Sequence, residues 1–206
     1  MASTPVVGTE GYAERAAALV EHWQKIPFAE HHAPVLPLLP DTPSRILDIG
    51  AGIGVDAAVF AAMGHSVVAV EPTEALRQAG MALHAGPGIE WLDDHLPDLA
   101  ILRARAVAFD VVMLSAVWMH LDAAQRRRAM PQVAALLGKD GVMILSLRHG
   151  PVPPGRRMFE VSGEETVQLA AEQGLACVLN LRTPSVQVGN REAGVFWTRL
   201  DRKSVV

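Results

Sequence analysis

Residues 45–56, with the sequence RILDIGAGIGVD, constrain the fold more than any other stretch of the chain. An apolar run closes on Asp48 and is followed by Gly50, Gly52 and Gly54, with one residue between successive glycines. Glycines in such a turn let the backbone approach a ligand closely and adopt φ values that a Cβ would forbid. In an open α/β sheet, ligands bind beyond the carboxyl ends of the strands. The stretch therefore predicts an α/β fold with a ligand site at this turn.

Apolar runs that predict strands alternate with helical segments after residue 45. Parallel strands are expected at RILDI, SVVAVE, IEWLDD, FDVVMLSAV and GVMILSL. Two further strands, LACVLNL and GVFWTRL, are separated only by a polar loop, so they must pair antiparallel if they are neighbours in one sheet. The alternation predicts a single doubly wound, mostly parallel sheet of about seven strands, with helices on both faces.

Helix signals occupy the intervals between the strands. The spacing of apolar residues predicts helices over residues 12–23, 55–63, 73–84, 122–138 and 162–174. Thr73, Asp122 and Ser162 stand at three of the expected helix starts, where a short polar side chain caps the first turn.

Length and composition limit the kind of protein. A chain of 206 residues with a net charge of −4 indicates one globular domain without the basic signature of a nucleic-acid binder. The single cysteine, Cys177, favours a reducing cytoplasm. Neither a membrane span nor a signal peptide is predicted. Within the domain (1–206) we expect an N-terminal helical cover, a ligand-binding core, and a C-terminal helix with a β-hairpin, over residues 1–44, 45–150 and 151–206.

Two residues distinguish between the nucleotides that such a turn could hold. The dinucleotide fingerprint requires a third small residue where this chain has Val55. A carboxylate at Asp48 would also repel a pyrophosphate, whereas it would attract a cationic sulfonium ligand that carries an ammonium group. Both observations favour S-adenosylmethionine (SAM) over NAD.

The chain at this point resembles the class I SAM-dependent methyltransferases. The resemblance rests on ILDIGAGIG, VVAVEPTEAL, WLDDHLPDL, FDVVMLSAVWMHL and LLGKDGVMILSL, with Asp140 replacing a glycine in the last segment. It implies a sheet of order 3-2-1-4-5-7-6 whose last strand is antiparallel. It also implies methyl transfer from SAM to an acceptor, with S-adenosylhomocysteine (SAH) as product and no metal.

The same resemblance implies a set of donor-binding residues. Glu71 is expected to accept hydrogen bonds from the ribose hydroxyls, and Asp94, rather than Asp93, to meet the adenine amino group. The full expected set is Asp48, Gly50, Ala51, Gly52, Gly54, Glu71, Pro72, Asp94, His95 and Ser115.

Catalytic candidates follow the fourth and fifth strands. His120 is either a general base or a packing residue that begins the next helix. Arg148 and His149 emerge from the fifth strand and either bind an anionic group of the acceptor or are solvated surface charges. Tyr12 and the pair His31–His32 belong to the N-terminal cover, and Tyr12 is expected to pack there. Two adjacent histidines without a third ligand are not expected to bind a metal.

The remaining expectations concern the acceptor and the surface. The segment LSAV lacks the Asn/Asp-Pro-Pro-aromatic turn of enzymes that methylate exocyclic or amide nitrogens, and a small-molecule acceptor is expected. Cys177 is expected in the core, and residues 126–128 on a solvated helix face. Two alternatives stay open: a SAM-binding protein without transferase activity, and an NAD-dependent oxidoreductase. The protein is expected to be a monomer or a homodimer.

Overall fold

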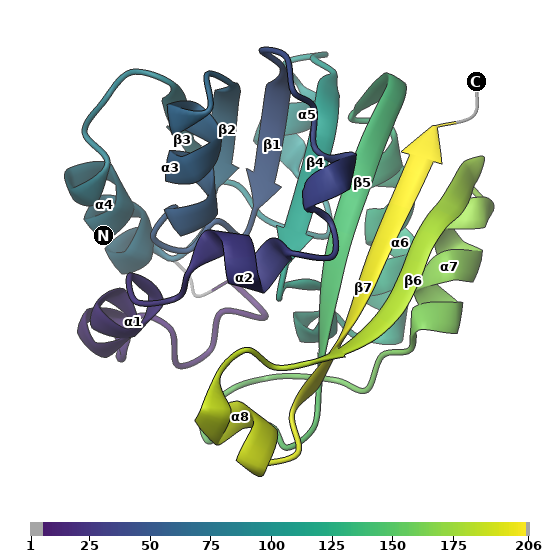
Figure 1. Ribbon diagram of the computed structural model, residues 1–206. Helices are drawn as coiled ribbons and strands as arrows, with labels where there is room; N and C mark the ends of the chain where they lie inside the picture. The colour runs from purple at the N-terminus through teal and green to yellow at the C-terminus, as the bar shows by residue number, and fades with distance from the viewer. Residues whose placement is uncertain (1–5, 205–206) are drawn as a thin grey trace.

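A computed structural model describes residues 6–204, which form one seven-stranded sheet of order β3-β2-β1-β4-β5-β7-β6. The first five strands are parallel, and β7 is antiparallel to both of its neighbours (Figure 1). The predicted order is therefore confirmed. The strands are β1 (Arg45–Ile49), β2 (Ser66–Val70), β3 (Ile89–Leu92), β4 (Phe109–Ser115), β5 (Leu137–His149), β6 (Leu175–Pro184) and β7 (Phe196–Ser204).

Two apolar cores cover the two faces of the sheet, because neighbouring residues of a strand point to opposite faces. In β1, Leu47 and Ile49 belong to the larger core, which includes Val133 and Leu169 of the helices beyond it. Ile46 belongs to the second core, beside Phe60. The central strands are apolar on both sides for this reason.

The helices lie on both faces and at one end of the sheet. Figure 1 shows α1, α2 and α8 near the end where the arrowheads of β1 and β4 lie. This arrangement places the N-terminal cover and the β6–β7 connection at the ligand-binding edge. The helices are α1 (Ala16–Trp23), α2 (Phe28–His32), α3 (Val55–Ala62), α4 (Glu74–Leu83), α5 (Ala100–Arg103), α6 (Ala123–Ala134), α7 (Gly163–Ala171) and α8 (Val188–Glu192), with 3₁₀ turns at Leu36–Leu38 and Trp118–His120.

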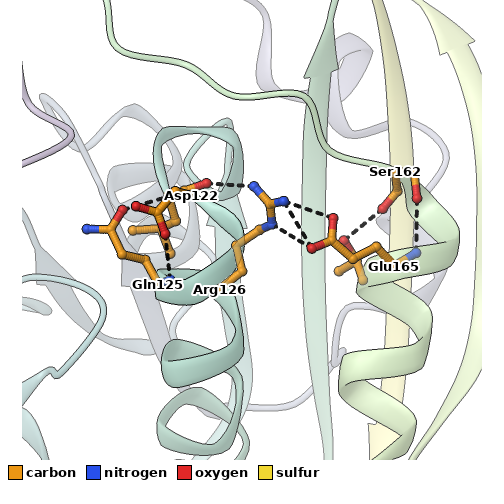
Figure 2. A network of polar contacts seen from close by, with 7 residues as sticks. Asp122, Gln125, Arg126, Ser162 and Glu165 are labelled. Atoms are coloured by element: carbon orange, nitrogen blue, oxygen red, sulfur yellow. Dashed lines mark hydrogen bonds and ion pairs between the residues drawn. The ribbon is translucent and has the colours of Figure 1, made fainter.

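The expected helix starts are mostly confirmed. Asp122 caps α6 in a reciprocal capping box with Gln125, and the Ser162 side chain accepts from the backbone N–H of Glu165 at the start of α7 (Figure 2). Thr73 occupies the N-cap position of α4, but its side chain makes no capping hydrogen bond. The first helix begins at Ala16 instead of residue 12, so Tyr12 lies in the preceding turn.

The prediction for Cys177 is wrong, and that for residues 126–128 is wrong at Arg126 but confirmed at Arg127 and Arg128, which are exposed. Cys177 is exposed, because it lies on edge strand β6, most of whose side chains no helix covers. Arg126 is buried rather than solvated: it makes a bidentate ion pair with Glu165 of α7 and donates to the Leu121 carbonyl (Figure 2). The ion pair joins α6 to α7.

Two smaller differences concern ends and loops. The β6–β7 connection, predicted as a polar loop, contains the short helix α8. Helix α6 ends at Ala134, and β5 already begins at Leu137 rather than after Gly138. Asp140, which replaces a glycine, has a φ of 61°.

No helix among residues 6–204 is long and apolar enough to cross a membrane.

Candidate active site

A cavity of about 260 Å³ lies at the carboxyl ends of β1, β2 and β4. Its wall combines the glycine turn with residues of the cover and of the β6–β7 connection. The predicted donor-binding residues that line it are Asp48, Gly50, Ala51, Gly52, Glu71, Pro72, Asp94, His95 and Ser115.

The glycine turn has the backbone geometry that the sequence predicts. Gly50, Gly52 and Gly54 all have positive φ, at 73°, 58° and 73°. A Cβ on Gly50 would lie 2.4 Å from Val117, and one on Gly52 would lie 2.9 Å from the Trp23 ring. Gly54 does not line the cavity. A Cβ on Gly54 would lie 2.6 Å from the Trp91 ring, so this glycine allows the start of α3 to pack closely against Trp91 of β3.

Glu71 ties β2 to the glycine turn. Its carboxylate accepts a hydrogen bond from the backbone N–H of Gly52 at 2.9 Å and another from that of Thr73 at 2.7 Å. Burial raises the pKa of Glu71, although these hydrogen bonds and the nearby Arg77 act in the opposite direction. The carboxylate is thus fixed in orientation at the cavity wall, with lone pairs left for a ligand.

Asp48 is the least satisfied acid of the site. The residue is 2% exposed, and none of the side chains described between residues 6 and 201 donates a hydrogen bond to its carboxylate. Burial, reinforced by the charges of Asp56 and Glu71, raises the pKa of Asp48 well above its usual value. A buried carboxylate without a partner at a cavity wall is a site for a cationic group.

The two neighbouring acids after β3 have different environments. Asp94 is buried at the cavity, and its oxygens accept from the backbone N–H groups of His95 and Leu102. Asp93 points outward and forms an exposed ion pair with Arg77. Of the two, Asp94 is therefore the acid that a ligand in this cavity reaches.

His120 is paired with Tyr12 across the cavity wall. The His120 Nδ1 atom lies 2.7 Å from the Arg157 carbonyl oxygen, which only accepts, so Nδ1 carries the proton of the neutral ring. Nε2 then accepts from the Tyr12 hydroxyl at 3.0 Å. Burial lowers the pKa of His120 and raises the pKa of Tyr12. The Arg156 guanidinium lies 3.4 Å from the Tyr12 ring centroid, and its charge acts to lower the pKa of Tyr12.

Arg148 and His149 do not line this cavity. Both line a separate hollow of about 410 Å³ beside β5. Arg148 donates to the Pro151 carbonyl, while His149 stacks on Phe196 and hydrogen bonds to Thr198. The charge of Arg148 nevertheless lowers the pKa of both Tyr12 and His120 in the cavity wall, whereas His149 has no such effect on them. The catalytic role of both residues stays a prediction.

Several cavity residues were not singled out as donor or catalytic residues from the sequence. Trp197 and Gln187 come from the C-terminal part of the chain, and no local pattern links them to the glycine turn. The others, Trp23, Phe28 and His31, belong to the cover, where their spacing indicates only packing. Within residues 6–204, no group of three potential metal ligands occurs.

Comparison with known proteins identifies the family. A family model described as a methyltransferase domain matches residues 21–180. The chain belongs to this methyltransferase domain family. The predicted SAM-dependent methyltransferase is thereby confirmed, and its sheet order is that of class I. No curated protein sequence matches the chain.

Solved structures share the fold of this methyltransferase. The N-methyltransferase NodS from Bradyrhizobium japonicum, solved with SAH, has a TM-score of 0.75 at 17% identity, covering 97% of this chain and 100% of NodS. The 1,6-didemethyltoxoflavin-N1-methyltransferase from Burkholderia thailandensis has a TM-score of 0.65 at 20% identity, covering 99% of this chain and 93% of its own. Magnesium protoporphyrin IX methyltransferase from Synechocystis PCC 6803 has a TM-score of 0.66 at 14% identity. The match covers 98% of this chain and 86% of the Synechocystis chain.

Proposed function

We propose that the cavity binds SAM through the three buried acids and transfers its methyl group to a small-molecule acceptor. The observation that carries the proposal is Asp48, a buried carboxylate without a protein partner beside the glycine turn. Its charge complements an ammonium or sulfonium group. Glu71 then meets the ribose hydroxyls, and Asp94 with His95 meets the adenine.

When bound, SAM supplies an activated methyl group, so the protein's main task is to align the acceptor with it. Proximity and orientation can lower such a barrier by about 7–11 kcal/mol in favourable cases. Trp23 and Val117 line the cavity and pack against Gly52 and Gly50 of the glycine turn. Ser115 lines the cavity where β4 ends.

The Tyr12–His120 pair is the proposed route for an acceptor proton. His120 is held neutral with Nε2 facing the Tyr12 hydroxyl. The Tyr12 oxygen can take a proton from the acceptor while its own proton moves to Nε2 of His120. General-base catalysis of this kind contributes typically ~10²–10⁴-fold. Removal of His120 is therefore expected to lower turnover and leave SAM binding intact.

Other properties belong to the same proposal. The Burkholderia structure contains 1,6-didemethyltoxoflavin, which supports a small molecule as the acceptor class.

The net charge of −4 argues against a nucleic-acid substrate, and the lone cysteine is consistent with the cytoplasm. A monomer or a homodimer is proposed. Arg148 and His149 are retained as candidates for contact with an acceptor that extends along β5.

The Glu71→Gln substitution tests the donor site. An amide keeps the size of the side chain but removes its negative charge. Its NH2 group also replaces one of the two oxygens that accept from the Gly52 and Thr73 backbone N–H groups, so the side chain can no longer accept from both ribose hydroxyls. We expect SAM affinity, measured by calorimetry, to fall about tenfold or more, which is about 1.4 kcal/mol. Asp93→Asn is the matched control, because Asp93 is exposed beside the cavity acid Asp94. Unchanged SAM binding by the Glu71 variant would refute this placement of the ribose.

Turnover separates the enzyme from a protein that only binds SAM. SAH release is measured against a library of small molecules, with wild type and His120→Ala in parallel. We expect release with at least one acceptor and a lower rate in the variant at equal SAM affinity. SAM binding without any SAH release would instead favour the binding protein.

A further inference from the structure

The wall of the donor cavity also contains aromatic side chains from distant parts of the chain. The chain contains one tyrosine, four tryptophans and five phenylalanines. The tyrosine, two tryptophans and one phenylalanine line this single cavity, at Tyr12, Trp23, Trp197 and Phe28. This concentration favours a flat ligand, because aromatic rings pack best against other planar groups.

One polar side chain stands among these rings without a hydrogen bond. His31 lines the cavity, and its Nδ1 atom is buried with no partner. Neither ring nitrogen forms a hydrogen bond with any of the residues whose side chains are described, 6–201. The ring is held from the side, edge-on to Trp197 at 5.8 Å and to His32 at 4.7 Å between centroids.

The neighbours of His31 fix both its position and its charge. His32 is anchored on Asp56 by a 2.8 Å contact, which restrains helix α2 against α3. Burial lowers the pKa of His31 to about 4, and the charges of Arg199 and His32 contribute in the same direction. Asp56 opposes this shift without reversing it. His31 is therefore neutral at physiological pH, with one nitrogen that donates and one that accepts.

We propose that Phe28, His31 and Trp197 form the acceptor pocket, and that it takes a planar aromatic compound whose hydroxyl group hydrogen bonds to His31. The inference rests on the proposed function, because the pocket continues the donor cavity. His31 is a positioning residue: it orients the acceptor and takes no proton from it. A buried imidazole left without a partner costs free energy that a bound hydroxyl group recovers.

The test compares two coumarins that differ at one group. SAH-loaded wild-type protein is titrated with 7-hydroxycoumarin and with 7-methoxycoumarin, in which the hydroxyl hydrogen is replaced by a methyl group. Loading with SAH is verified first by calorimetry, so failure of the donor site is detected separately. We expect 7-hydroxycoumarin to bind about tenfold or more tightly than the methoxy compound.

Variants assign this preference to His31. His31→Phe keeps a ring but removes both nitrogens, and the preference for the hydroxyl is expected to disappear at unchanged SAH affinity. His31→Gln, which restores a donor and an acceptor, is expected to recover part of it. Trp197→Leu is expected to weaken both coumarins equally. His84→Phe is the matched control, because His84 lies outside the cavity wall, and it should bind both compounds as wild type does.

Several results would overturn the proposal. They are a failure of SAH-loaded wild type to bind either coumarin, equal affinity for the two compounds, or a preference that persists in His31→Phe. The wild-type comparison stands alone if a variant does not fold. SAH binding with no discrimination between the coumarins would reject the aromatic pocket and leave the donor site intact.

Discussion

At Asp48, the proposed contact with SAM and the stability of the folded protein make opposite demands. Its pKa is raised in the folded protein, chiefly by burial. The folded state therefore holds the proton more tightly than the unfolded chain. The free energy of unfolding then falls as pH rises from the unfolded pKa, about 4, to the higher folded value. Ionised Asp48 destabilises the protein until a cation meets it.

Asp48→Asn is expected to separate these two effects. The amide cannot ionise, so the ligand-free variant should unfold at a higher temperature than wild type at pH 7 in calorimetry. SAM affinity should fall by about 2 kcal/mol or more, because a buried charge pair is lost. A variant that is both less stable and equally tight in SAM binding would contradict this account.

The same carboxylate predicts a pH dependence of donor binding. The proposed contact between Asp48 and SAM requires the ionised carboxylate. In the ligand-free protein the pKa of Asp48 is raised by burial, and the charges of Asp56 and Glu71 act in the same direction. Affinity should therefore decrease as pH falls through the pKa of the ligand-free site, with proton release on binding. Calorimetry in buffers of different ionisation enthalpy measures that release. Asp48→Asn should show a smaller release and a flatter profile.

Individual site residues could be predicted only where one motif contains them. The glycine turn, Glu71 and Asp94 lie within short motifs at strand ends, where chain order fixes their place. His31 and Trp197 are 166 positions apart in numbering, and only the tertiary fold brings their rings to 5.8 Å. No local periodicity carries that information.

Helices α6 and α7 are joined by an ion pair with one buried partner. The side chain of Arg126 is 4% exposed and that of Glu165 31%, with Nη2 and Oε2 at 2.9 Å. Glu165→Ala would leave the guanidinium with only the Leu121 carbonyl. We expect a loss of about 3 kcal/mol in the free energy of unfolding by urea, the lower end of the range for broken buried pairs.

The control for this prediction is Asp98→Ala. It removes the partner of Arg128, whose side chain is 63% exposed, and it should cost about 0–1 kcal/mol. Equal losses in the two variants would mean that the Arg126 pair is worth no more than a surface contact.

At the scale of elements, the strands were easier to predict than the helix faces. Strands β1 and β4 are mostly apolar, as expected of parallel strands that are covered on both faces of the sheet. The run of three arginines that begins at Arg126 predicts a solvated helix face. The spacing of Arg126 held a signal nevertheless: Ala129, Met130 and Val133 follow at helical intervals and are buried on the same face. The burial of Arg126 depends on Glu165, which belongs to a distant helix.

The whole molecule places two distant segments over one edge of the sheet. Helices α1 and α2 come from the N-terminus, whereas α8 lies between β6 and β7 (Figure 1). Their contact includes a 3.0 Å hydrogen bond between His22 of α1 and Gln187. The resemblance implies the order of the strands. It does not predict how the N-terminal helices and the β6–β7 connection contact each other above the cavity.

Because both segments line the cavity, donor binding should stabilise the whole fold and not only a loop. SAM at 100 times its dissociation constant is expected to add about 2.7 kcal/mol to the free energy of unfolding. For a domain of this size that corresponds to a rise in melting temperature of about 5–10 °C. NAD should produce no shift, since its pyrophosphate would face Asp48. Thermal unfolding with each ligand measures this, and stabilisation by NAD alone would reject the assignment of the donor cavity.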